Sequence, residues 1–258
     1  MIVVGSGAIG SEFAWFYAAL GVRVTIVEYM PRMMPLEDEE VSKTMERAFR
    51  KLRAAVLTST TVKSVRVNTE GRCEVEIEGK KGAETLTADI VLSAVGIKSN
   101  IENIGLEELG VAVERDKVVV DQFYRTNVPG VYAIGDIVGG PALAHVASAE
   151  GICCVEAICG LNPAPVDYST IPSCVFTSPE VASVGMTEQQ AQELGIAYKT
   201  GRFPFTASGK ATAAGDRDGF VKLLFGEDDT LLGAHMVGMN VTEMIAEPTL
   251  ARMLGATG

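Results

Sequence analysis

Residues 1–10 of the chain, MIVVGSGAIG, decide the fold. The apolar run at residues 2–4 predicts a short buried strand, and the pattern G-x-G-x-x-G follows it at once. A helical pattern then continues to Leu20, and a second strand at residues 22–27 ends at the acidic Glu28. This order of strand, glycine-rich turn, helix and acidic residue is typical of a βαβ unit that binds a dinucleotide.

Each glycine of this turn has a physical reason to be there. Gly5 permits the tight turn, Gly7 lets the backbone approach a pyrophosphate, and Gly10 lets the helix pack closely on the strand. The helix N-terminus offers unpaired N–H groups to the negative charge. Glu28 is spaced to accept both ribose hydroxyls of an adenosine, which favours NAD over NADP. A 2′-phosphate would require arginines beside it, and Arg32 is nearby, so NADP stays an alternative cofactor. The plainer alternative, a glycine-rich turn of some other α/β protein, leaves Glu28 unexplained.

Length and composition set the broad class of the protein. The 258 residues suffice for one large domain or two ordinary ones, and 47% of them are hydrophobic. This content supports a sizeable core and excludes a disordered or fibrous chain. The net charge of −11 disfavours nucleic-acid binding, because an acidic surface repels phosphate backbones. No apolar run reaches the roughly 18 residues of a membrane span and no basic leader opens the chain, so we expect an intracellular protein without membrane association.

The five cysteines predict reduced, mostly buried thiols, because an odd number in a long chain does not indicate a disulfide framework. Cys154 and Cys159 lie five residues apart on a predicted helix, which places their sulfurs about 140° apart around the helix axis. A disulfide requires Cβ atoms about 3.8 Å apart, so this pair is not expected to close. No metal site is predicted.

Periodicity extends the first unit to about one hundred residues. Helical spacing of apolar residues predicts a helix over residues 37–52, and alternation predicts strands and hairpin turns between residues 56 and 91. The apolar run at residues 89–95 predicts a further buried strand. Together with the βαβ unit, these elements predict a Rossmann-like nucleotide-binding domain over residues 1–97.

A second domain is predicted over residues 98–164. It contains expected strands at residues 117–121 and 130–136, the second of which ends in Gly-Asp, and a helix at residues 143–159. The run GLNPAP then leads as a linker into the next domain.

A third domain is predicted over residues 165–258. A helix at residues 187–194 begins at the N-cap candidate Thr187, and a helix at residues 242–254 contains Pro248, which is expected to kink or break it. Strands are predicted near residues 174–176, 198–205, 220–225 and 231–237. The fold class that follows for the whole chain is α/β.

Four motifs give the chain a family resemblance. They are residues 5–13 with Glu28, the strand end LSAVG at 92–96, the run TNVPGVYAIGD at 126–136 followed by LAH at 143–145, and FPF at 203–205 with GFVK at 219–222. The chain resembles the flavoprotein pyridine-nucleotide disulfide oxidoreductases over essentially its full length, and within them the dihydrolipoyl dehydrogenases. The resemblance implies that the second domain is the C-terminal part of an FAD-binding central domain. The third is then a truncated α+β dimerisation domain.

The resemblance also assigns residues to two cofactors. The residues implied to bind NAD are Gly5, Gly7, Ile9, Gly10, Glu12, Glu28, Val62 and Gly96. Within this set, Val62 and Gly96 edge the nicotinamide nucleotide, and Glu12 lies near the nicotinamide–flavin contact and pairs with a lysine of the family. The residues implied to bind FAD are Asp136 at the ribityl chain and Leu143, Ala144 and His145 beneath the flavin ring.

Each of these side chains also has a plainer interpretation. Asp136 would serve as a turn or N-cap aspartate, His145 would simply open a helix, and Glu12 would be a solvated helix residue. His235 is expected to be a strand histidine without a chemical role.

The family works by an electron relay that this chain does not contain in full. A dithiol reduces a C-x-x-x-x-C disulfide, the electrons pass to FAD, and NAD accepts a hydride. The resemblance implies that the disulfide precedes residue 1 and that a catalytic histidine–glutamate pair follows residue 258. We therefore expect an internal fragment with no catalytic residues of its own, inactive when alone.

Three functions are compatible with the sequence. The first is a dihydrolipoyl dehydrogenase-like oxidoreductase, a homodimer whose partner is the lipoyl domain of a 2-oxo acid dehydrogenase complex, in the cytoplasm or the mitochondrial matrix. The second is another NAD(P)H-dependent reductase of the family, acting on glutathione, mercuric ion or another disulfide. The third is a non-catalytic nucleotide-binding protein that dimerises through its last hundred or so residues.

Overall fold

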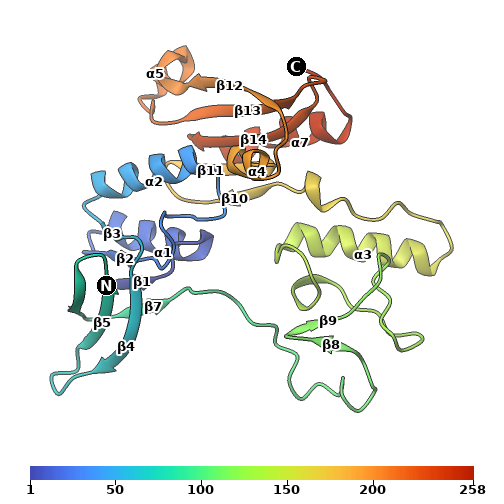
Figure 1. Cartoon of the computed structure of the whole chain (residues 1–258), viewed down its shortest axis with the longest axis horizontal. Coiled ribbons are helices and arrows are strands. Elements are labelled where there is room, and N and C mark those ends of the chain that lie inside the picture. Colours follow the sequence, from blue (N-terminus) through green and yellow to red (C-terminus); the bar gives the residue numbers. More distant parts are fainter. The chain divides into compact units, whose positions relative to one another are not determined.

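The computed structural model describes residues 1–258, which form two compact units (Figure 1). One unit combines Met1–Gly96 with Pro172–Gly258, and the other is Ile97–Ile171. The three domains expected from the sequence stay a prediction, but the first and third of these segments share one compact unit. No helix in the chain combines the length and the apolarity that crossing a membrane requires.

A four-stranded parallel sheet forms the centre of the larger unit (Figure 1). Its strand order is β3-β2-β1-β7, with β1 at Ile2–Val4, β2 at Thr25–Val27, β3 at Ala55–Leu57 and β7 at Val91–Ser93. Helix α1 (Ala8–Ala19) connects β1 to β2, and helix α2 (Glu39–Lys51) connects β2 to β3. The sequence therefore predicted the βαβ unit correctly, although β2 is shorter than expected. The carboxyl ends of β1, β2 and β7 meet at one edge, where nucleotides bind in open α/β sheets.

A three-stranded antiparallel sheet is inserted between β3 and β7. Its strands are β4 (Thr61–Val67), β5 (Cys73–Gly79) and β6 (Gly82–Ala88), in that spatial order. The predicted alternation places Val75 and Ile77 of β5 in a core that they share with Ile2 and Val27 of the parallel sheet. The hairpins expected from this part of the sequence are therefore confirmed.

The rest of the larger unit is a five-stranded antiparallel sheet with short helices (Figure 1). Its strand order is β10-β11-β14-β13-β12, with bounds Ser173–Val175, Glu180–Gly185, Leu231–Gly238, Phe220–Gly226 and Tyr198–Pro204 in that order. The sequence interpretation missed β11, which is short and pairs with both β10 and β14. The helices are α4 (Glu188–Glu193), α5 (Gly209–Ala214), α6 (Val241–Met244) and α7 (Ala246–Met253).

Two predicted helix signals in this part of the chain are confirmed. Thr187 forms a capping box with Gln190 at the start of α4. The helix expected around Pro248 breaks at Ile245 into α6 and α7. Pro248 occupies the first turn of α7, where its missing N–H has no intrahelical partner to lose, so the break precedes the proline.

One hydrophobic core joins the parallel sheet to the five-stranded sheet. Helix α2 buries Val41, Met45 and Phe49 in this core, at the spacing of a helix face. Val3 and Ile26 enter it from the parallel sheet, and Val181, Phe220 and Val237 enter it from the five-stranded sheet. The two sheets are therefore held in one unit by a helix layer that contacts both.

The smaller unit has little regular strand structure. It contains the two-stranded sheet of β8 (Val113–Glu114) and β9 (Lys117–Val118), the 3-10 helices η1 (Gly135–Ile137) and η2 (Tyr168–Thr170), and helix α3 (Ala144–Ile158). The prediction of a strand over residues 130–136 was wrong. Tyr132 forms a single bridge with Arg125, and Gly135 then turns with φ of +76° into η1. An isolated bridge gives the segment one paired position, which is too little to make a strand.

Two burial predictions were also wrong. The strand expected over residues 89–95 reduces to β7 at the edge of the sheet, and Ile90 and Val95, which lie outside the strand, are largely exposed. All five cysteines are free, as predicted for the thiols, but Cys159 is exposed because it caps the outer end of α3. Cys153 and Cys154 are buried as expected.

Candidate functional site

A pocket of about 580 Å³ opens at the carboxyl ends of β1, β2 and β7. Five of the residues predicted to bind NAD line it together, namely Gly5, Gly7, Glu28, Val62 and Gly96. They come from four separate segments of the chain, which only the fold brings to one place. The volume lies within the range of about 300–1,000 Å³ that is usual for small-molecule sites. We refer to it as the nucleotide pocket.

The three glycines of the turn occupy different environments. A Cβ atom at Gly5, which has φ of +94°, would lie 2.4 Å from the carbonyl oxygen of Ala94. A Cβ atom at Gly10 would lie 2.1 Å from the carbonyl oxygen of Gly5. A Cβ atom at Gly7 would meet nothing within 4 Å. Gly5 and Gly10 are therefore required because a side chain at either position would clash with the backbone. Gly7 leaves open space on the pocket side of the turn.

Helix α1 begins in this open space without a side-chain cap. Its N-cap is Gly7, and no side chain accepts a hydrogen bond from the first turn. The unpaired N–H groups of a helix start, together with the helix dipole, attract an anionic group. The pocket therefore presents backbone donors where the sequence predicted a pyrophosphate.

Glu28 is buried and firmly anchored at the end of β2. Its Oε2 accepts hydrogen bonds from the backbone N–H of Ser6 at 2.8 Å and from the Ser6 hydroxyl at 2.7 Å. Its Oε1 accepts from the backbone N–H of Met30 at 2.7 Å. Oε2 uses both of its lone pairs on Ser6, whereas Oε1 has a second lone pair, so the anchored group still has acceptor capacity for a sugar hydroxyl there. The structure therefore places the carboxylate in the pocket wall with a fixed orientation.

Ser6 is a buried residue of the site that the sequence analysis did not single out. Besides binding Glu28, its hydroxyl oxygen accepts from the backbone N–H of Met34 at 3.2 Å. Ser6 thus joins the glycine-rich turn to the loop after β2, which supplies Pro35 and Leu36 to the pocket wall. A polar residue between two glycines of the pattern was the signal available in the sequence.

Three predicted NAD residues lie outside the pocket lining. Ile9 is exposed on α1, and Gly10 packs against the turn. Glu12 is half-buried, and its carboxylate accepts a hydrogen bond from the backbone N–H of Phe176 at 2.8 Å. Glu12 is therefore held at the end of β10 and is not merely a solvated helix residue. Its role near the nicotinamide stays a prediction.

The residues predicted to bind FAD lie in the smaller unit around the start of α3. Asp136 is exposed in η1, Leu143 is the N-cap of α3, and Ala144 and His145 form its first turn. Helix α3 also begins without a side-chain cap. The four residues thus occupy two adjoining backbone turns, and their contact with FAD stays a prediction.

Glu150 is a second residue that the sequence analysis missed. It is 1% exposed, and its Oε2 accepts from the backbone N–H of Gly135 at 2.6 Å. Its Oε1 accepts from the Tyr168 hydroxyl at 2.7 Å. Burial, with the hydrogen bond to Glu150 as a further cause, raises the pKa of Tyr168 well above its usual range. Glu150 therefore fixes the Gly-Asp turn. The sequence signal that could have identified it was an acidic residue within the otherwise apolar helix α3.

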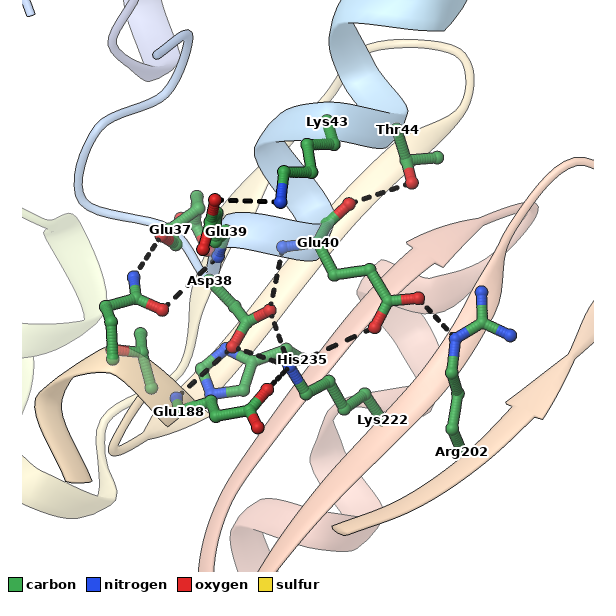
Figure 2. Close-up of polar contacts among 12 residues, drawn as sticks. Glu37, Asp38, Glu39, Glu40, Lys43, Thr44, Glu188, Arg202, Lys222 and His235 are labelled. Carbon is green, nitrogen blue, oxygen red and sulfur yellow. Dashed lines mark hydrogen bonds and ion pairs between the residues drawn. The ribbon is translucent and has the colours of Figure 1, made fainter. Parts of the chain in front are cut away.

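Buried ionic contacts join the loop after β2 to the five-stranded sheet (Figure 2). Lys222 of β13 donates to both carboxylate oxygens of Asp38, at 2.9 and 3.0 Å, and to Glu188 at 2.5 Å. Asp38 also accepts from the backbone N–H groups of Glu40 and Glu188, so it caps α2 and binds the first residue of α4. We call Asp38, Lys222 and Glu188 the clamp.

The clamp sets the protonation of its members. Burial alone would raise the pKa of Asp38, but the hydrogen bonds and charge of Lys222 bring it below its ordinary value. Burial likewise opposes the charge on Lys222, but the hydrogen bonds that it donates to Glu188 and Asp38 raise its pKa above the ordinary value. Beside the clamp lies the buried His235, whose Nε2 donates to the Met186 carbonyl at 2.9 Å and whose pKa burial lowers. His235 therefore lies in a strand as predicted, in its neutral form.

The arrangement as a whole defines an α/β protein of the dinucleotide-binding type, with an open glycine-rich turn, an anchored acid and a second, antiparallel domain. The chain belongs to the pyridine nucleotide-disulphide oxidoreductase family. The family model matches residues 1–151, and the model of the family's dimerisation domain matches residues 171–258.

The chain is also similar over its whole length to individual proteins. A dihydrolipoyl dehydrogenase of Rhizobium etli is 48% identical over 260 residues, which cover 100% of this chain and 54% of the relative. The mitochondrial dihydrolipoyl dehydrogenase of Canis lupus familiaris is 41% identical and covers 100% of this chain and 51% of its own length. The crystal structure of LpdA from Mycobacterium tuberculosis superposes with a TM-score of 0.90 at 29% identity, over 99% of this chain and 55% of that one. The chain thus spans about half the length of these relatives.

Proposed function

We propose that the chain is the NAD-binding and dimerisation part of a dihydrolipoyl dehydrogenase. Such an enzyme is a flavin-dependent oxidoreductase that passes electrons from a dihydrolipoyl dithiol through a disulfide and FAD to NAD. The observation that carries the proposal is the 48% identity to a dihydrolipoyl dehydrogenase over the whole chain. The convergence of five predicted residues on one pocket supports it independently.

The residues of the nucleotide pocket fit NAD. The open side of Gly7 and the uncapped start of α1 would hold the pyrophosphate, and the anchored carboxylate of Glu28 would accept the adenosine hydroxyls. When bound, NAD supplies the acceptor for a hydride. The negative charge of Glu28 opposes a 2′-phosphate, and Ser6 fixes that charge in the pocket wall, so the chain prefers NAD to NADP.

The residues around the start of α3 are those we assign to FAD. Asp136 offers an exposed carboxylate as acceptor for a sugar hydroxyl, and Glu150 holds the turn that presents it. The uncapped helix start at Leu143 favours negative charge beside Ala144 and His145. When bound, FAD carries electrons between a dithiol and the nicotinamide.

The chain's own cysteines do not supply the redox disulfide. All five are free, and Cys154 and Cys159, the pair with the family's spacing, are buried and exposed respectively on α3. In the proposed enzyme the redox disulfide therefore comes from other sequence. We further propose a homodimer formed through residues 171–258, the lipoyl domain of a 2-oxo acid dehydrogenase complex as partner, and a cytoplasmic or mitochondrial-matrix location.

Calorimetric titration of the chain with NAD and NADP tests the cofactor assignment. We expect NAD to bind at least about tenfold more tightly, a difference of about 1.4 kcal/mol. Equal affinities, or no saturable binding of either, would contradict the proposal. An assay of NADH formation from dihydrolipoamide completes the test, and robust turnover by this chain alone would show that its own cysteines carry the dithiol chemistry.

A further inference from the structure

A second hollow of the larger unit has no part in the proposed function. It has a volume of about 370 Å³ and lies between the later turns of α2, the end of β12 and the loop before β13. None of its lining residues lines the nucleotide pocket. We call it the α2–β12 pocket.

Four basic side chains line the α2–β12 pocket. Arg47 and Lys51 come from α2, Arg202 comes from β12, and Arg217 comes from the loop before β13. Asp218 is the one carboxylate on the lining. In a chain with 33 acidic and 22 basic residues, such a gathering of positive charge runs against the overall field of the protein.

Two of the four cations are held by acidic neighbours. Lys51 pairs with Asp218 at 2.5 Å. Arg202 pairs with Glu40, as Figure 2 shows, and its guanidinium lies 4.7 Å from the centre of the Phe220 ring. These contacts give two of the four basic side chains an acidic partner.

The other two cations have no acidic partner in residues 1–258. Arg47 donates to the Thr44 hydroxyl at 2.8 Å, and Arg217 makes no ion pair. The helix dipole accounts for basic residues at the end of α2, but it does not account for Arg202 and Arg217, which belong to other elements. The pocket therefore holds two uncompensated guanidinium groups from separate segments of the chain.

We propose that the α2–β12 pocket binds a small phosphorylated polyanion, with two or more phosphoryl charges. Guanidinium groups bind phosphate through paired N–H donors, and two of them without carboxylates call for at least two negative charges. The hydroxyl of Thr206 on the lining supplies a further donor, whereas the Thr44 hydroxyl already donates to the Glu40 carbonyl. The volume exceeds that of a single phosphate ion and suits a diphosphate or a phosphorylated metabolite.

Titration of the full chain with inorganic pyrophosphate tests this site. We expect saturable binding that weakens as the salt concentration rises, since the contacts are ionic. The double variant Arg47→Gln/Arg217→Gln should lose affinity by about tenfold or more, which corresponds to about 1.4 kcal/mol. Because neither guanidinium has a carboxylate partner, the variant should melt at the temperature of the unaltered chain. Should it fail to fold, Arg217→Gln alone serves, as Arg217 is exposed.

A matched control removes the same charge elsewhere. Arg23 and Arg53 are exposed residues of the same unit that line neither pocket, so Arg23→Gln/Arg53→Gln should bind pyrophosphate as the unaltered chain does. Equal losses in both double variants would attribute the binding to net charge and overturn the proposal. Binding that survives Arg47→Gln/Arg217→Gln but is abolished by saturating NAD would place the anion on the glycine-rich turn and also overturn it. Citrate that binds as tightly as pyrophosphate would contradict the phosphoryl class.

Discussion

Replacement of Lys222 by methionine tests the energetic weight of the clamp. The Lys222 ammonium lies 2.9 Å from Asp38, and the two side chains are 5% and 0% exposed. The change leaves the Asp38 carboxylate buried without its cation, and loss of one partner of a buried pair costs about 3–5 kcal/mol. Backbone N–H groups of Glu40 and Glu188 still donate to Asp38, so we expect the lower end, about 3 kcal/mol, in urea unfolding at neutral pH.

Two further variants separate the clamp from general effects of losing a lysine. Lys199→Met removes an exposed pair with Asp229 in the same sheet, and we expect a change of at most about 0.5 kcal/mol. Asp38→Asn/Lys222→Met removes both charges and should recover much of the loss, because the fully buried charge of Asp38 is removed together with its cation. A loss below about 1 kcal/mol in Lys222→Met, similar to that of Lys199→Met, would refute the reasoning.

The pH dependence of stability follows from the same contacts. The pKa of Asp38 is lowered in the folded chain, so its contribution is present above the ordinary aspartate pKa of about 3.9 and is lost as the pH falls through the folded pKa. The pKa of Lys222 is raised, so its contribution is present below about 10.4 and is lost as the pH rises through the folded pKa. In Lys222→Met both dependences should flatten.

Further predictions concern the glycine-rich turn, Glu28 and the cysteines. Gly7→Ala should leave the melting temperature unchanged but weaken NAD about tenfold, because its methyl group enters the open space of the pocket, whereas Gly10→Ala should cost about 1–3 kcal/mol of stability through its clash with the turn. Glu28→Gln should reduce the ratio of NAD to NADP affinity in calorimetry, since the charge that opposes a 2′-phosphate is gone. Thiol titration of the unfolded chain without reductant should count five free thiols, and a count of three would reveal a disulfide such as Cys154–Cys159.

The parts of the fold predicted correctly are those with short-range signals. The glycine-rich turn, the N-cap at Thr187 and the hairpins between β4 and β6 each depend on residues a few positions apart. The strand expected over residues 130–136 failed because strand formation depends on a partner, and Tyr132 has only Arg125. The missed strand β11 is the converse, a short segment that is a strand because β10 and β14 flank it.

The residues of the candidate site also separate into those with a short-range sequence signal and those that depend on distant partners. The pattern predicted Gly5, Gly7 and Glu28 because a general motif prescribes their spacing. It could not predict the clamp, since Lys222 and Asp38 are 184 positions apart in the chain. A local signal existed for one of its three residues, Lys222. Alternation in β13 places Lys222 on the same face as Phe220 and Leu224, which are buried, so a partner for its charge had to exist.

The clamp also connects residues 171–258, which match the family's dimerisation domain, to the wall of the nucleotide pocket. The loop after β2, which supplies Pro35 and Leu36 to the pocket wall, is tied at Met34 to Ser6 and at Asp38 to Lys222. An apolar contact would fill the space at Asp38 but would not fix the loop, because hydrophobic packing has no direction. Hydrogen bonds that one carboxylate accepts from a lysine and from two helix starts do have direction. The wall of the nucleotide pocket is therefore positioned by a residue of the five-stranded sheet.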